Sequence, residues 1–88
     1  MNARIAKMQS LLAALDPVSL DIIDESHKHA GHAGARDGGG HYLLHIASMR
    51  FTGANTVTRH RMIYSALGEM MGREIHALTI LAHVPEET

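Results

Sequence analysis

The 88-residue chain contains no cysteine and carries almost no net charge. Without cysteine, the chain alone cannot form a disulfide, a thiolate nucleophile or an all-cysteine metal site. The formal net charge of −1 argues against strong non-specific binding to nucleic acid, because such binding needs a basic surface. The chain does have eight histidines, which would add positive charge near about pH 6.

Aromatic residues and long apolar runs are also scarce. Tyr42, Phe51 and Tyr64 are the only aromatic residues, so the core must consist largely of Leu, Ile, Val, Met and Ala. No apolar run approaches the roughly 18 residues of a transmembrane helix. The apolar residues near the N-terminus recur periodically, which indicates a helix face and not a secretory signal. We expect a single domain over residues 1–88, no membrane association and a cytoplasmic location, with an organelle such as the mitochondrion as the alternative.

The first predicted element is an amphipathic helix over residues 3–15. Asn2 is its expected N-cap. The helix should end at Asp16-Pro17, because the residue before a proline is disfavoured in helical geometry. Its apolar face has helical spacing and comprises Ile5, Met8, Leu12 and Leu15.

Three segments have the alternating pattern of strands, at 18–24, 42–48 and 75–82. The first two flank residues 27–40, which hold five glycines in fourteen residues together with His27, His29 and His32. This composition predicts a loop, so the two flanking strands should pair antiparallel.

A second helix should precede the third strand. A tight turn at Phe51-Thr52-Gly53 leads to a cap at Asn55 or Thr56, and the helix then runs through Arg59 to Met71. Gly72 suits the left-handed residue after a helix end. The apolar face is expected to comprise Val57, His60, Ile63, Tyr64, Leu67, Met70 and Met71, which makes His60 a partly buried structural residue.

The element order is α-β-β-α-β, with a short C-terminal helix expected from Val84. The fold class is α+β: a three-stranded mixed sheet with helices packed on it. If the second and third strands are parallel, both start at the same edge of the sheet, and His76 lies near the histidine-rich loop. If they are antiparallel, His76 lies at the opposite edge and no such site exists.

Neutral imidazole is a ligand for zinc, copper, nickel and iron. His76 would be held by secondary structure, and one of the loop histidines could supply a second ligand. Two histidines do not complete a four-coordinate site, so water or a partner protein must supply the rest. The alternatives are that the loop histidines are solvated and His76 bonds to backbone, or that the loop itself forms a homomeric zinc or copper site.

Arg59 and Arg61 lie about 200° apart around a helix and cannot form one clamp. They form either a solvated face or a contact for a partner or an anion, because positive charge near a helix N-terminus is disfavoured. The sequence has no Ser-His-Asp pattern, no P-loop and no recognisable pair of catalytic carboxylates. We expect no enzymatic activity.

Several short motifs occur together and in order along nearly the whole chain. They are Asp24-Glu25-Ser26 followed by His29, His41-Tyr42, Phe51-Thr52-Gly53, Arg59-His60-Arg61-Met62-Ile63-Tyr64 and Ile75-His76-Ala77-Leu78. As a set, these motifs resemble the BolA family. The resemblance implies a fold similar to a class II KH domain that lacks the helix-joining GxxG. This chain departs from the family pattern in a loop richer in glycine and histidine and in a shortened terminal helix.

The resemblance also implies a function in iron homeostasis. Proteins similar to this one pair with a monothiol glutaredoxin, and the heterodimer holds a bridging 2Fe–2S cluster with thiolates from glutaredoxin and glutathione. His76 would be one ligand and His29 the second, with His27 and His32 as alternatives. We expect no cofactor in the isolated chain, which would be a monomer or weak homodimer. The alternative implied function is transcriptional regulation, with DNA contacted by the helix that carries Arg59 and Arg61.

Overall fold

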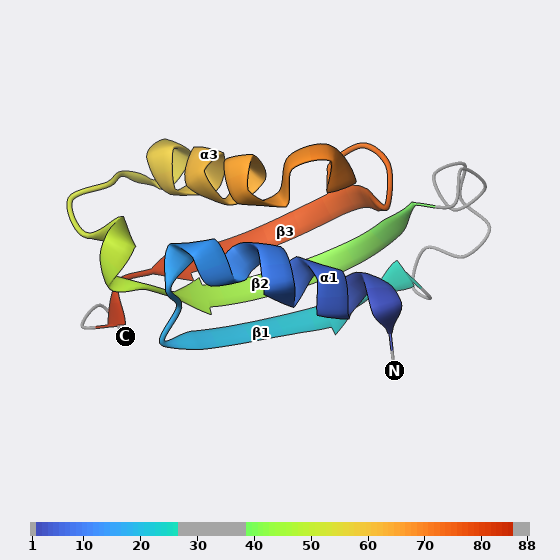
Figure 1. Cartoon of the computed structure of the whole chain (residues 1–88). Coiled ribbons are helices and arrows are strands. Elements are labelled where there is room, and N and C mark those ends of the chain that lie inside the picture. The colour runs from blue at the N-terminus through green and yellow to red at the C-terminus, as the bar shows by residue number, and fades with distance from the viewer. Residues whose placement is uncertain (1, 27–38, 86–88) are drawn as a thin grey trace.

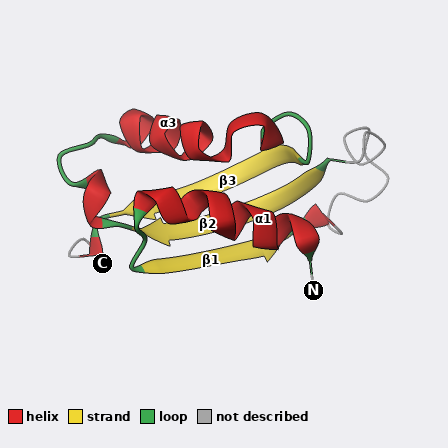
Figure 2. Cartoon of the chain, in the orientation of Figure 1, coloured by secondary structure: helices red, strands yellow, loops and turns green. Residues whose placement is uncertain are grey.

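The computed structural model describes residues 2–26 and 39–85. The predicted order of elements is confirmed, and short 3₁₀ turns follow both helices and β2 (Figure 1, Figure 2). The elements are α1 (Ala3–Leu12), η1 (Ala13–Leu15), β1 (Ser19–Asp24), β2 (Gly40–Ala47), η3 (Met49–Phe51), α3 (Thr56–Leu67), η4 (Gly68–Met70) and β3 (Ile75–His83).

The three strands form one mixed sheet in the order β1-β2-β3. β1 pairs antiparallel with β2, and β2 pairs parallel with β3. In Figure 1 the arrows of β2 and β3 accordingly point the same way, with α3 in the crossover between them. The strand direction on which the predicted site depends is therefore confirmed.

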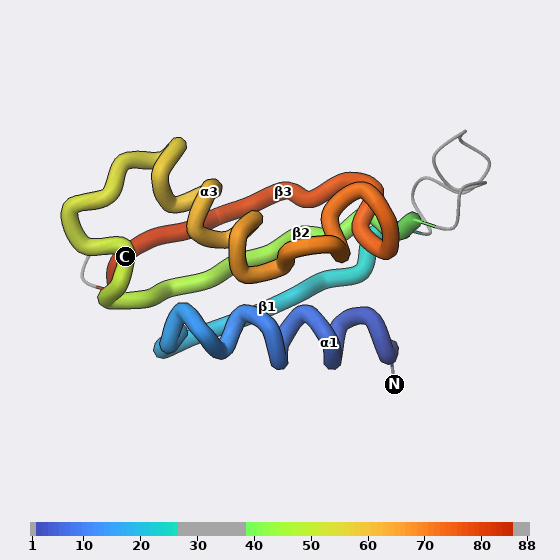
Figure 3. Tube along the Cα trace, turned by 45° about the horizontal axis from the view of Figure 1, so that its top comes forward, coloured from blue at the N-terminus to red at the C-terminus, as the bar shows by residue number. Residues whose placement is uncertain are grey.

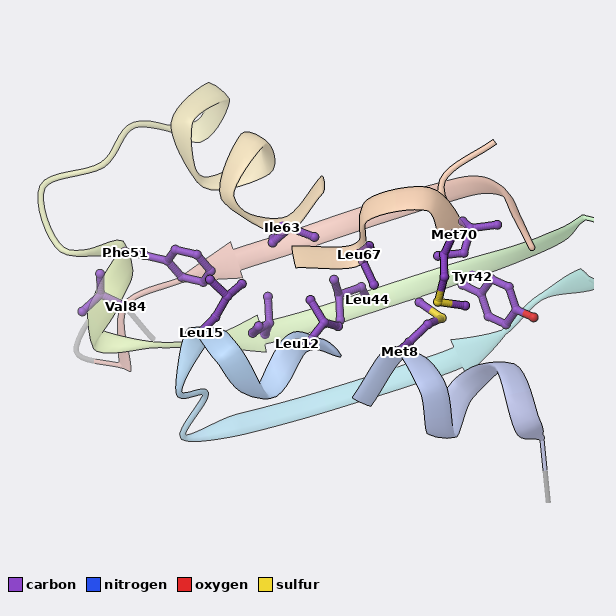
Figure 4. Close-up of a cluster of buried hydrophobic side chains, with 12 residues drawn as sticks. Met8, Leu12, Leu15, Tyr42, Leu44, Phe51, Ile63, Leu67, Met70 and Val84 are labelled. Atoms are coloured by element: carbon purple, nitrogen blue, oxygen red, sulfur yellow. The ribbon is translucent and has the colours of Figure 1, made fainter. Parts of the chain in front are cut away.

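Both helices cover the same face of the sheet, as Figures 1 and 3 show from two directions. The opposite face of the sheet is not covered by either helix. The core lies between the two layers, where α1, α3 and the inner face of β2 meet (Figure 4). Its fully or nearly fully buried side chains include Met8, Leu12, Tyr42, Leu44, Ile46, Phe51, Ile63, Leu67, Met70 and Ile75.

Side-chain caps begin both helices as predicted. The Asn2 Oδ1 accepts hydrogen bonds from the backbone N–H groups of Arg4 and Ile5. The Asn55 Oδ1 accepts one from the Thr58 N–H at 2.9 Å. Each cap satisfies donors that have no partner within the helix.

The predicted end of α3 is wrong. The α-helix stops at Leu67, and Gly68 adopts a positive φ of 57° before a 3₁₀ turn reaches Met70. Gly72 does have the expected positive φ, 83°, but it lies in the turn that leads into β3. The reason is Gly68, which takes the left-handed conformation at little cost and so ends the helix before the apolar pattern ends.

The predicted apolar face of α3 is also partly wrong. Ile63 and Leu67, one turn apart, are buried, but Val57 is 58% exposed and Tyr64 42% exposed. Val57 precedes Ile63 by six residues and so lies about 240° around the helix from it. His60 is half-buried, with its ring edge-on to that of Tyr64 at 6.4 Å.

The turn after β2 has the predicted form. Phe51 is fully buried and Gly53 has a φ of 79°, a value that favours glycine. The C-terminal helix expected from Val84 falls mostly on residues 86–88, which lie outside the described residues.

Candidate functional site

The site begins where β2 and β3 start side by side. The Gly40 N–H donates to the Glu74 carbonyl at 3.0 Å, just before β3. Gly40 then pairs with Ile75, whereas His41 pairs with Ala77, so the register shifts by one residue. His76 is the extra residue of this bulge. A bulge bends the strand and re-aims a side chain, and here it presents an exposed histidine at the edge of the sheet.

Gly39 packs directly against the start of β3. A Cβ atom on Gly39 would lie 2.8 Å from the Cβ of His76 and 3.1 Å from the carbonyl oxygen of Arg73. The first of these distances is shorter than real Cβ contacts allow, so this approach of the two segments requires glycine. The chain that enters β2 is thereby held against the backbone of His76.

His41 is the described histidine that lies beside His76. The two ring centroids are 5.2 Å apart and the ring planes are tilted by 42°. His41 is half-buried and His76 is exposed. Sequence reasoning did not include His41 among the candidate ligands. Its place at the start of the strand parallel to the His76 strand was the signal that could have found it.

The Asp24-Glu25-Ser26 run ties the end of β1 to the same edge. The Ser26 Oγ accepts a hydrogen bond from the His41 N–H at 3.0 Å, and the Glu25 N–H donates to the His41 carbonyl at 2.8 Å. The Asp24 carboxylate accepts from the Ser26 N–H at 2.9 Å and from the Asn2 side-chain amide at 2.7 Å.

Both ends of the segment between β1 and β2 are therefore anchored beside His76. The Ser26 Oγ is hydrogen-bonded to the His41 N–H, and Gly39 packs against His76. His27, His29 and His32 themselves lie outside the described residues, so their role stays a prediction. What the structure places together is the exposed His76, the neighbouring His41 and the two ends of the histidine-rich segment.

The described part of the chain does not complete a metal site. Within residues 2–26 and 39–85, no three His, Cys, Asp or Glu side chains are arranged to hold a metal ion. An exposed imidazole without cysteine neighbours suits a shared site whose remaining ligands come from another molecule. The described residues of this edge thus offer an exposed imidazole that could serve as one metal ligand.

The two arginines of α3 differ in environment. The Arg59 Nε donates to the Ala54 carbonyl at 2.8 Å, and its NH1 donates to the Ala82 carbonyl at 3.2 Å. The guanidinium also lies 6.0 Å from the centroid of the Phe51 ring. Arg59 thus links the start of α3 to the end of β3, a structural role that the sequence did not reveal. Arg61 is exposed.

Comparison with known proteins identifies the family. The model of the BolA family, described as "BolA-like protein", matches residues 11–87. The chain belongs to the BolA-like family. The solved structure of BolA1 from Arabidopsis thaliana superposes on the whole chain with a TM-score of 0.84, at 38% identity and covering 98% of that chain. The BolA-like fold is thus shown by sequence and by structure.

Two curated relatives show different contexts for the BolA-like fold. SufE-like protein 1, chloroplastic/mitochondrial, of Arabidopsis thaliana is 43% identical over 90% of this chain, which spans only 23% of that relative's length. The DNA-binding transcriptional regulator BolA of Escherichia coli is 39% identical over 90% of this chain and 72% of its own length.

The cytoplasmic location predicted here stays a prediction. No helix in the described part of the chain is long and apolar enough to cross a membrane.

Proposed function

We propose that this BolA-like chain is a non-enzymatic iron–sulfur adaptor. It pairs with a monothiol glutaredoxin and supplies histidine ligands to a bridging 2Fe–2S cluster, whose thiolates come from glutaredoxin and glutathione. The observation that carries the proposal is the arrangement at this edge of the sheet. His76 is exposed, Gly39 packs against it, and Ser26 is hydrogen-bonded to the neighbouring His41.

Three features of this edge support the proposal. The bulge leaves His76 exposed and therefore reachable by a docked partner. The hydrogen bonds around Ser26 hold the entry to the histidine-rich segment at the same edge. The lack of cysteine means that thiolates must come from outside the chain. A cluster with mixed histidine and cysteine ligation has a higher reduction potential than an all-cysteine one.

His76 is the first ligand in this proposal. His29 is the second, with His27 and His32 as alternatives. His41 lies beside His76 and limits the space available to its ring, so we assign it the role of positioning His76. Loss of His76, a ligand, should change the spectrum of the cluster. Loss of His41, its neighbour, should chiefly weaken the binding of the cluster.

The test is reconstitution of the complex. The chain is mixed with a monothiol glutaredoxin, glutathione, ferric iron and sulfide, and visible absorption and circular dichroism are recorded together with the size of the complex. His76→Ala should change the spectrum, and one of the three loop variants, His29→Ala first, should do the same. His60→Ala on α3 is the matched control. A spectrum unchanged by His76→Ala would show that the ligand assignment is wrong.

A DNA-binding regulator is the second candidate function, favoured by the similarity to the DNA-binding transcriptional regulator BolA of Escherichia coli. Arg61, exposed on α3, is the better placed of the two arginines for a phosphate contact. Binding through arginine and phosphate should weaken steeply with salt. If the chain does not bind duplex DNA at moderate salt, this role for α3 is excluded. The same holds if Arg61→Ala leaves the affinity for DNA unaltered.

A further inference from the structure

The open face of the sheet carries a second pair of histidines. Along β2, Leu44 and Ile46 face the helices, so His45 between them points to the opposite face. His45 pairs with Leu81 and Ala47 pairs with His83, which places His83 on the same open face, one diagonal step from His45. Neither helix covers this face (Figures 1 and 3).

The two rings are in close contact. Their centroids are 4.7 Å apart, their planes are inclined at 63°, and the two Nε2 atoms are 3.4 Å apart. A Zn–N bond is about 2.0–2.1 Å long, so two imidazole nitrogens on one tetrahedral zinc ion lie about 3.4 Å apart. The observed spacing thus matches that of two ligands on one ion.

We propose that His45 and His83 form a bidentate site for a divalent transition metal ion such as Zn²⁺. Both side chains come from neighbouring strands of one sheet, so the pairing of β2 with β3 fixes the backbone positions from which the two rings reach each other. His45 is exposed and His83 is half-buried, so the ion can reach the pair from solvent. Asp21 lies opposite His45 on β1 and adds a negative charge beside the site.

This site is distinct from the edge that contains His76. His45 lies four residues beyond His41 along β2, about 13 Å at the rise of a strand, and toward the end of the sheet where β2 and β3 finish (Figure 1). No third metal ligand joins the pair within residues 2–26 and 39–85. The described residues thus supply two ligands to the ion, and water can occupy the coordination positions that no other ligand fills. The proposal does not depend on a glutaredoxin partner.

The contact at 3.4 Å also fits a hydrogen bond between two neutral imidazoles, and zinc titration separates the two interpretations. The histidine ring resonances of the intact chain are followed by NMR while Zn²⁺ is added. We expect the signals of His45 and His83 to move together and to saturate at the same concentration of zinc. If both signals stay unchanged while zinc binds elsewhere, His45 and His83 form only a hydrogen bond with each other.

Variants give the second measurement, because the chain has other histidines that can bind zinc. In the parent for this series, His27, His29, His32 and His76 are replaced by alanine. His45→Ala and His83→Ala in that parent should each weaken zinc binding by at least about tenfold, since losing even an outer partner of a metal site costs that much. His60→Ala should leave it unchanged. Equal affinities for the parent and its His45→Ala variant would overturn the proposal, and circular dichroism checks that each variant is folded.

Discussion

The ring of His41 lies 5.2 Å from that of His76, although 35 positions separate the two residues in the chain. Three local features bring them together: parallel pairing of β2 with β3, a bulge that sets His76 out of register, and a glycine at position 39. The pair marks the edge of the sheet at which the proposed cluster site would form. Each feature can be disturbed separately, which makes the site open to test.

The first prediction concerns Gly39. Gly39→Ala puts a Cβ atom 2.8 Å from the Cβ of His76, so one of the two segments must move. We expect a loss of roughly 1–3 kcal/mol in the free energy of unfolding, measured by urea denaturation, as for other overpacked sites. The NMR signals of the His76 ring should shift, and binding of the cluster with glutaredoxin should weaken.

Gly53→Ala is the control for this substitution. A Cβ on Gly53 would have open space around it, and only its φ of 79° opposes alanine. The expected cost is about 1–2 kcal/mol, from the left-handed backbone alone. The His76 signals should stay in place. If both variants leave His76 undisturbed, the contact with Gly39 does not position this histidine.

The second prediction concerns Ser26. Ser26→Ala removes the acceptor of the hydrogen bond from the His41 N–H, which is part-buried. The expected destabilisation is about 1 kcal/mol, the usual net worth of such a bond. Amide hydrogen exchange at His41 should accelerate, whereas Ser10→Ala, on the exposed side of α1, should change neither quantity. Unaltered exchange at His41 would argue against the anchoring role of Ser26.

The order of the elements, the antiparallel pairing of β1 with β2 and the helix caps could be predicted from the sequence, because they depend on local patterns and on few possible connections. The bulge at His76 could not, because Ala77 and Leu78 are both apolar and so hide the change of phase between the buried Ile75 and the core-facing Leu78. His41 could have been found without that register, from its place at the start of β2 beside the start of β3. The intramolecular role of Arg59 depends on where β3 ends, which only the folded chain reveals.

The third prediction follows from the corrected face of α3. Ile63 is fully buried, whereas Val57, on the same helix, is 58% exposed. Ile63→Ala should lower the free energy of unfolding by about 2–5 kcal/mol, because it leaves a cavity in the core. Val57→Ala should change it by no more than about 0.5 kcal/mol. If Ile63→Ala and Val57→Ala lower the free energy of unfolding equally in thermal or urea unfolding, Val57 belongs to the apolar face, as first expected from the sequence.

The fourth prediction separates the structural and the binding role of the two arginines. Arg59→Ala removes hydrogen bonds to the Ala54 and Ala82 carbonyls, so it should cost roughly 1–3 kcal/mol of stability, with part of this regained in Arg59→Lys. Arg61→Ala should change stability by less than about 0.5 kcal/mol, because Arg61 is exposed. A loss of DNA or glutaredoxin binding in the Arg61 variant would therefore report a direct contact. The same loss in the Arg59 variant would be informative only at a temperature where unfolding measurements show that the variant is fully folded. An Arg59→Ala variant as stable as the parent would contradict the link between α3 and β3.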